Sequence, residues 1–249
     1  MQPLVRSRAI QGLIAATLGL LSNFPDADPS FSELPEPYIE ALVDEVQSAD
    51  LASPGRKDLL RRLARDGRDV VRVRVADAAG RLWRDDPECG LSILRRLACD
   101  PIARVRAAAA RSLGFFIERA PAPLRAAVES EWAAASAQGE RVALGLALGE
   151  AKPSWLTDLA LEELASDPSG RVRWAALRAA EAHLHLDPAA YVRLALAHIG
   201  DPDRHVRKSA RRLLRRAERS GYEPASLGRK ARRAERQRAR QAMRASAPT

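Results

Sequence analysis

A phrase of seven residues recurs four times in this chain, and its spacing constrains the fold more than any other feature. It begins with Asp followed by Pro or Gly and ends, after three variable residues, with Val-Arg. The aspartates of successive copies are separated by 34, 67 and 34 residues, and 67 is close to twice 34. A fixed period of this size is typical of stacked repeats, in which each unit packs on its neighbours. The copies span Asp66–Arg72, Asp100–Arg106, Asp167–Arg173 and Asp201–Arg207.

Each repeat is predicted to be a pair of antiparallel helices. Alanine, leucine and arginine are abundant, aromatic residues make up only 4% of the chain, and no segment alternates in the manner of a strand. We therefore expect an all-α fold, a right-handed α-solenoid of about five repeats. First helices are expected near residues 57–65, 88–99, 123–136, 154–166 and 188–199. Second helices are expected near residues 69–84, 102–119, 139–149, 169–185 and 203–219.

The periodic region divides the chain into three parts. Residues 1–55 are expected to hold N-terminal capping helices and a proline-rich loop, residues 56–220 the repeat array, and residues 221–249 a basic C-terminal tail. The stretch 9–21 leaves two interpretations open. Its helical spacing of apolar residues favours a packed first helix, whereas Arg6 and Arg8 ahead of it resemble the start of a signal segment. It is too short to span a bilayer.

The residues of the phrase have a physical explanation as a helix-to-helix turn. Asp is expected to cap the second helix, Pro suits the start of a helix, and Val begins the buried stripe. A degenerate middle copy is expected at residues 139–142, where Val142 is kept and both the Asp-Pro and the following Arg are absent. The repeated Asp and Arg are predicted to pair along the stack as a ladder, although a row of anion-binding arginines is the alternative. The ladder would comprise Asp66, Arg72, Asp100, Arg106, Asp167, Arg173, Asp201 and Arg207.

The pattern Asp-Pro-x-x-x-Val-Arg-x-x-Ala-Ala resembles that of HEAT repeats, in the bacterial form also seen in phycobilisome-lyase-like repeats. The resemblance covers residues 56–219. It implies a HEAT-like array, and it says little about function, because such arrays serve as scaffolds, adaptors, lyases and nucleic-acid binders.

Nothing in the sequence predicts a metal or cofactor site. His183 and His185 are two residues apart, which places them on different faces of a helix, and no glycine-rich phosphate loop is present. Cys89 and Cys99 are interpreted as reduced thiols of a cytoplasmic protein. We expect no cofactor, no metal and no catalytic residue.

A weaker resemblance links residues 165–176 to the HEAT-like DNA-alkylation-repair glycosylases, and it would imply a role for Arg173. That resemblance also implies a Trp followed four residues later by Asp in the preceding repeat, whereas Trp132 is followed at that distance by Ser136. Trp174 has two interpretations: it lines a groove for a partner, or it fills space between repeats.

Positive charge is concentrated at the C-terminal end. Residues 204–249 hold 16 Lys and Arg against 3 Asp and Glu, whereas residues 1–203 carry a net charge of −4. One face of the last predicted helix carries Arg204, Lys208, Arg211, Arg212, Arg215 and Arg219. The tail beyond it carries Arg229, Lys230, Arg232, Arg233, Arg236, Arg238, Arg240 and Arg244.

These cations are the predicted polyanion-binding residues. The preference for Arg over Lys in the tail suits bidentate contacts with the phosphates of DNA or RNA. An acidic protein, an anionic membrane and mere solubility are the alternatives. The leading hypothesis is a non-enzymatic, monomeric scaffold without a membrane span, which holds a protein partner in the solenoid groove and nucleic acid at its basic end. A glycosylase-like repair protein and a pure protein–protein adaptor are the competing hypotheses.

Overall fold

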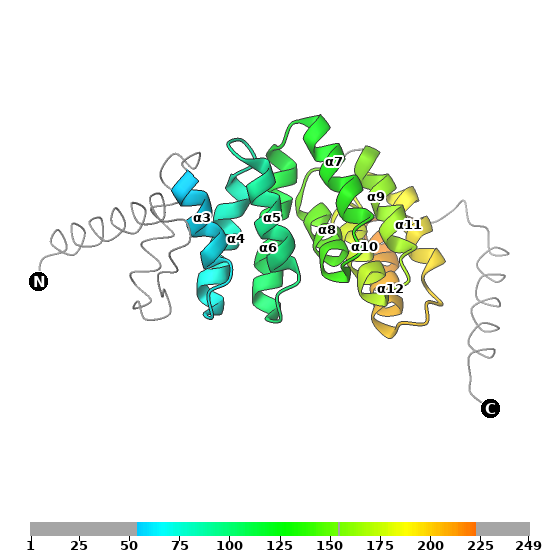
Figure 1. Cartoon of the computed structure of the whole chain (residues 1–249). Helices are drawn as coiled ribbons and strands as arrows, with labels where there is room; N and C mark the ends of the chain where they lie inside the picture. The colour runs from blue at the N-terminus through cyan, green and yellow to red at the C-terminus, as the bar shows by residue number, and fades with distance from the viewer. Residues whose placement is uncertain (1–53, 154, 223–249) are drawn as a thin grey trace, which may run out of the picture. The chain divides into compact units, whose positions relative to one another are not determined.

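The computed structural model describes residues 54–153 and 155–222, and all regular structure in these ranges is α-helix. The chain separates into two compact units, Met1–Pro121 and Ala122–Thr249. The described helices of the first unit are α3 (Pro54–Leu63), α4 (Asp69–Arg81), α5 (Pro87–Ala98) and α6 (Ala103–Arg119) (Figure 1). Those of the second unit are α7 (Ala122–Ala133), α8 (Gln138–Glu150), α9 (Trp155–Ala165), α10 (Gly170–Ala182), α11 (Pro188–Ala197) and α12 (Arg204–Arg219).

The predicted all-α class is confirmed by the described residues. Every helix expected in the repeat array is present, and its ends differ from the expected ones by at most three residues. The expected N-terminal helices, and the tail from residue 223 onward, lie outside the described residues.

The valines of the four phrase copies form part of the core. Val71, Val105, Val172 and Val206 are all buried, and in the last three copies a small buried alanine follows one turn later on the same face: Ala109, Ala176 and Ala210. Because an alanine or glycine has little or no side chain, the second helices of neighbouring repeats within one unit approach one another closely.

In the first unit, this close approach joins α4 to α6. A Cβ atom added to Gly80 of α4 would lie 2.7 Å from the carbonyl oxygen of Ser112 and 3.1 Å from its Cα atom. No side chain larger than hydrogen fits at Gly80 unless the two helices separate.

In the second unit, the same device joins α8 to α10. A Cβ atom at Gly145 would lie 2.8 Å from the Cβ atom of Ala175, and one at Gly149 would lie 3.1 Å from the Cα atom of Ala179. The second helices α8, α10 and α12 therefore pack as one continuous layer within this unit (Figure 1).

The aspartates of the phrase stabilise the turns, and the prediction that they cap the second helices was wrong. Asp100 Oδ1 accepts a hydrogen bond of 2.8 Å from the N–H of Ile102, and Asp167 accepts one of 2.7 Å from Ser169. Ile102 and Ser169 are the residues that immediately precede α6 and α10. The carboxylate thus closes an Asx turn one step before the helix begins. Of the four helices that follow a copy of the phrase, α4, α6, α10 and α12, only α12 has a side-chain cap, which Asp203 provides.

Gly67 offers a test of this account of the turn. The other complete copies of the phrase have Pro at this position, Gly67 has no positive φ, and no heavy atom lies within 4 Å of a Cβ added there. Gly67→Pro is expected to raise the free energy of unfolding by about 0.5–1 kcal/mol, because proline restricts the unfolded chain. Urea unfolding followed by circular dichroism measures the change. A loss of stability would show that the first turn differs in backbone conformation from the others.

Candidate polyanion-binding surface on α12

The arginine of each phrase connects its own turn to the next one. In the first unit, Arg72 Nη1 donates to the carbonyl oxygens of Asp66 and Gly67, at 2.7 and 3.0 Å. The opposite edge of the guanidinium binds the carboxylate of Asp100 in the next turn, with Nε at 2.6 Å and Nη2 at 3.1 Å. Both side chains are largely buried, so this bidentate pair is part of the core.

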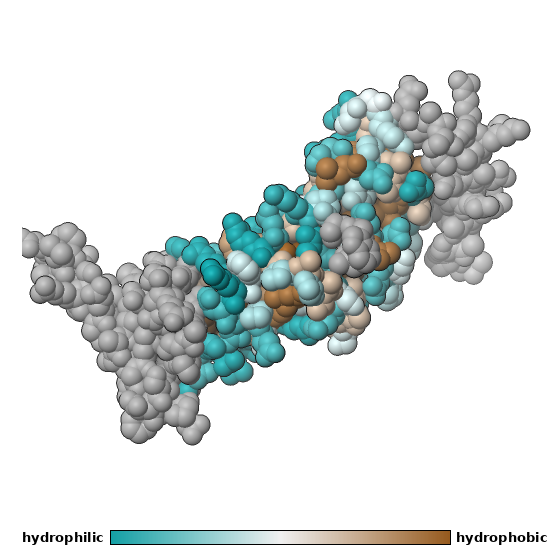
Figure 2. Space-filling model, turned by 90° about the horizontal axis from the view of Figure 1, so that it is seen from above, coloured by the Kyte–Doolittle hydropathy of each residue, from teal (hydrophilic) through white to brown (hydrophobic). Residues whose placement is uncertain are grey.

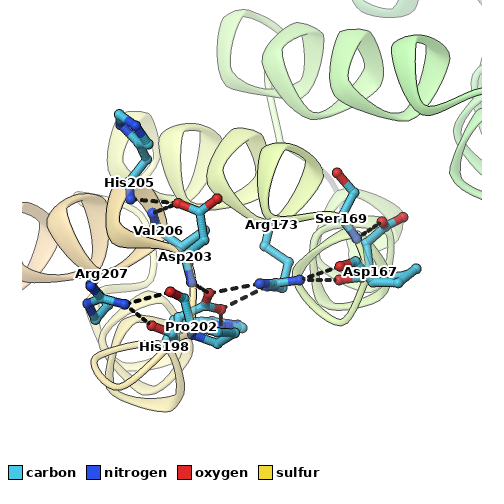
Figure 3. Close-up of polar contacts among 11 residues, drawn as sticks. Asp167, Ser169, Arg173, His198, Pro202, Asp203, His205, Val206 and Arg207 are labelled. Atoms are coloured by element: carbon cyan, nitrogen blue, oxygen red, sulfur yellow. Dashed lines mark hydrogen bonds and ion pairs between the residues drawn. The ribbon is translucent and has the colours of Figure 1, made fainter. Parts of the chain in front are cut away.

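The second unit repeats this geometry (Figure 3). Arg173 Nη1 donates to the carbonyl oxygens of Asp167 and Pro168, at 2.8 and 2.9 Å. Its Nε and Nη2 atoms bind the two oxygens of Asp201, each at 2.8 Å. Arg173 therefore lies between two turns, and each edge of its guanidinium has a structural partner.

Arg141 is a further member of the ladder that the sequence analysis missed. Its Nη1 atom donates to the carbonyl oxygens of Ala135 and Ser136, and its Nε atom binds Asp167 at 2.6 Å. The interpretation that the middle copy lacks the arginine was wrong, because it was aligned on Val142 instead of Arg141. Ala135 and Ser136 occupy the Asp-Pro positions of that copy.

The ladder shifts the pKa values of its aspartates. Burial by itself would raise the pKa of Asp201, but the hydrogen bonds from Arg173 and from the N–H of Asp203, with the positive charge of Arg173, outweigh it and lower the pKa. Asp100 has a lowered pKa for the same reasons, with Arg72 in the corresponding place. Both carboxylates are thus held in the ionised form.

These shifts predict a loss of stability in acid. A carboxylate with a lowered pKa in the folded protein stabilises it fully above its unfolded pKa of about 3.9, and the contribution disappears as the pH falls through the folded value. We expect the free energy of unfolding in urea to be steady from neutral pH to about pH 5 and to decrease below about pH 4. Asp201→Asn should show a smaller decrease over the acid range. An equal decrease in both proteins would contradict a role for this pair.

Two arginines of the predicted ladder have no aspartate partner among the described residues. Arg106 Nη1 donates to the carbonyl oxygens of Asp100 and Pro101, at 2.7 and 2.8 Å. In the sequence, the next copy of the phrase carries Ala135 in the position of the aspartate. Asp66, the first acid of the set, is bound by its neighbour Arg68 at 2.7 Å.

Arg207 is the last arginine of the phrase. Its Nη1 atom donates to the carbonyl oxygens of Asp201 and Pro202, at 2.6 and 2.7 Å (Figure 3). Within residues 54–153 and 155–222, no acidic side chain binds its other edge. The prediction of a continuous ladder therefore needs correction at Arg106 and at Arg207.

The outer surface of α12 carries a row of cations, which we call the basic stripe: Arg204, Lys208, Arg211 and Arg215. These four side chains are exposed, and they lie opposite the buried face formed by residues such as Val206 and Leu213. Lys208, Arg211 and Arg215 form no ion pair or hydrogen bond within the part of the chain that the structure describes. Each pair of like charges one helical turn apart costs about 0.2–0.5 kcal/mol, so folding alone gives no reason for the stripe.

Arg212 differs from the stripe, although the sequence places it on the same charged face. Its Nε and Nη2 atoms bind Glu181 Oε2 of α10, at 2.8 and 2.5 Å. Glu181 is buried, and Arg178 and Arg216 lie within 3.6 and 3.9 Å of it. Arg212 therefore has a structural partner, which a helical spacing alone does not reveal.

The other residues predicted to bind a partner are Arg219, the cations of the tail, and Trp174. Arg219 is exposed at the end of α12, and the tail cations from Arg229 to Arg244 lie outside the described residues. Trp174 is partly exposed on α10, next to Arg173 in sequence. A surface cavity of about 710 Å³ in the second unit is lined by residues that include Arg173, His198 and Asp201, but Trp174 is not among them.

Apolar side chains are sparse on the described surface. The exposed large apolar residues are Ile102, Phe115, Leu159 and Leu186. Figure 2 shows hydrophilic residues over most of the face in view, with hydrophobic ones in small separate patches. On α6, Arg119 covers the ring of Phe115 at 3.9 Å from its centroid. The described surface therefore presents mainly polar groups.

Comparison with known families supports the resemblance to HEAT repeats. The family model described as HEAT repeat matches residues 91–120. This segment contains most of α5, the Asp100 turn and α6, which form a helix pair with the phrase arginine at the start of the second helix. HEAT repeats indicate a protein-binding scaffold or adaptor. A search of curated proteins gave no match.

No helix in the described ranges combines the length and apolar character needed to cross a bilayer. Residues 54–153 and 155–222 also contain no group of three or more His, Cys, Asp or Glu side chains placed to hold a metal ion.

Proposed function

We propose that this chain is a HEAT-type binding scaffold whose basic C-terminal end contacts the phosphate backbone of DNA or RNA. The observation that carries the proposal is the basic stripe of α12. Its cations are exposed, lie on one helix face and have no acidic partner among the described residues. A polyanion would neutralise this face and remove the repulsion between its charges.

Comparison with the other arginines of the repeat array strengthens this proposal. Arg72, Arg141 and Arg173 each bind an aspartate, and Arg212 binds Glu181. Arginines with a structural task in this fold are therefore recognisable by their partners. The cations of the basic stripe have no such acidic partner among the described residues, which favours a role in binding a ligand.

The glycosylase alternative depends on Arg173, and the structure gives that residue another explanation. Both edges of its guanidinium bind the turns on either side, and its side chain is only 12% exposed. An arginine held in this way has no free donor edge for a damaged base. The contacts of Arg173 therefore favour a structural role for this residue over the catalytic one that the glycosylase alternative would give it.

Two neighbouring arginines of α12 provide a matched test of nucleic-acid binding. Arg211→Gln and Arg212→Gln remove the same charge one residue apart, but only Arg212 has an acidic partner in the structure. Arg211→Gln is expected to weaken binding of a labelled DNA or RNA duplex a few-fold and to reduce the slope of log K against log salt by about 1. Arg212→Gln should change the slope less and lower stability more. Fluorescence anisotropy across a salt series measures both.

The contribution of the tail is tested separately in the full-length chain. Replacing Arg229, Arg232, Arg233 and Arg236 with Gln keeps the length and removes half of the tail cations. If the tail and the basic stripe bind the same polymer, the slope of log K against log salt is expected to decrease more than it does in Arg211→Gln. Wild-type protein that binds neither DNA nor RNA in a salt-dependent manner would refute the proposal and favour the pure adaptor.

A further inference from the structure

The guanidinium of Arg207 is held in a defined position, and no described acidic side chain binds its second edge. In Arg72, Arg141 and Arg173, Nη1 binds two carbonyl oxygens of the same turn while the Nε and Nη2 edge binds a carboxylate. Arg207 makes the same two anchoring bonds, at 2.6 and 2.7 Å. Its Nε and Nη2 edge binds no acidic group in the described part of the chain.

The surroundings of the Arg207 side chain are strongly positive. A surface depression of about 280 Å³ is lined by five residues, all basic: Arg207 and the four members of the basic stripe. No carboxylate lines it. The charge of this depression favours a ligand with several negative charges over a single acidic side chain.

We propose that the Nε and Nη2 edge of Arg207 is a preformed bidentate contact for one phosphate of a nucleic-acid backbone. This inference rests on the proposed function and names the residue that fixes the position of the backbone on α12. The edge already binds two oxygens of one anionic group in the equivalent arginines, and a phosphate presents two oxygens to a guanidinium in a similar fork. Because two carbonyl bonds already fix the guanidinium, little side-chain freedom is lost when the phosphate binds.

The basic stripe fits the flanking phosphates. Along α12, the distance from Arg204 to Arg215 corresponds to a rise of about 16 Å at 1.5 Å per residue. Along the axis of a duplex, one strand advances about 3.4 Å per phosphate, so a segment of this length laid parallel to that axis covers roughly five phosphate steps. Arg207 would then set the register, and the stripe would add attraction that depends on salt concentration.

Arg207→Lys separates fork geometry from charge in the full-length protein. Lysine keeps the positive charge but cannot form the bidentate contact. We expect binding of a labelled duplex to weaken about tenfold with an unchanged salt slope. Arg211→Lys is the matched control, because Arg211 is exposed and has no anchor, and its affinity should change less than about twofold. Equal small effects of the two variants would overturn the inference.

A second measurement, by NMR, follows the unaltered protein, and the variant serves only to assign one signal. The Nε–H signal of Arg207, assigned by its loss in Arg207→Lys, is expected to shift on addition of a DNA or RNA duplex. A signal that stays in place while the duplex binds would overturn the inference and leave the proposed function intact. Self-association that is lost in Arg207→Lys would also overturn it, because the edge would then be occupied by a carboxylate from a second copy. Absence of any salt-dependent binding by the wild type would instead refute the proposed function.

Discussion

Arg173→Met is expected to lower the free energy of unfolding by about 3 kcal/mol, measured by urea denaturation. The substitution leaves the carboxylate of Asp201, whose side chain is 4% exposed, without its bidentate partner. It also removes the two hydrogen bonds that join Arg173 to the carbonyl oxygens of its own turn. A charge that is buried without a partner is costly, because it has lost water and gained no counter-charge in exchange.

Arg207→Met is the matched control for this substitution. Arg207 makes the same two carbonyl bonds but pairs with no described carboxylate, so its loss should cost only about 1 kcal/mol. The difference between the two variants isolates the contribution of the aspartate pair. Equal decreases in the free energy of unfolding would show that these arginines stabilise the fold through the carbonyl bonds and not through the ion pair.

Gly80→Val is expected to destabilise the first unit by about 3 kcal/mol. The added side chain would meet the backbone of Ser112, which cannot rotate away as a flexible side chain can. α4 and α6 would have to separate, and both helices would lose packing along their contact. Thermal unfolding followed by circular dichroism should show a large decrease in the midpoint.

Gly67→Val introduces the same side chain at a turn position where nothing lies within 4 Å. This control variant should stay within about 0.5 kcal/mol of the wild type. A similar loss at both positions would mean that valine acts through the unfolded chain or through local backbone preference. A small effect at Gly80 would mean that the layer of second helices is looser than the structure indicates.

The helices could be predicted from the sequence because the repeat phrase marks each turn directly. Asp, Pro and Val differ in chemistry from the Ala- and Leu-rich helices around them, so their positions locate the helix boundaries. The middle repeat was aligned incorrectly because Ala135 and Ser136 carry no such mark. A count of residues would have found Arg141, which lies 35 residues after Arg106 and 32 before Arg173.

The candidate site could be predicted only in outline. Helical spacing placed Arg211 and Arg212 on one charged face, but it could not show that Glu181, 31 residues earlier, binds only one of them. Nor could it show that no described acidic side chain binds the Nε and Nη2 edge of Arg207, because such a pairing depends on how distant residues pack. Pairings between distant residues arise from the packing of helices, and single-helix periodicity does not contain them.

The arginine ladder also gives each unit a chemical polarity. In the three steps formed by Arg72, Arg141 and Arg173, the cation is anchored in one turn and the anion belongs to the following turn, so the order of donor and acceptor is the same in each. If a repeat that begins with Asp-Pro were joined after α12, its aspartate could pair with the guanidinium of Arg207. The two ends of such an array therefore differ: a further repeat could form this ion pair at the C-terminal end, after α12. The same end of the chain carries the excess of Lys and Arg.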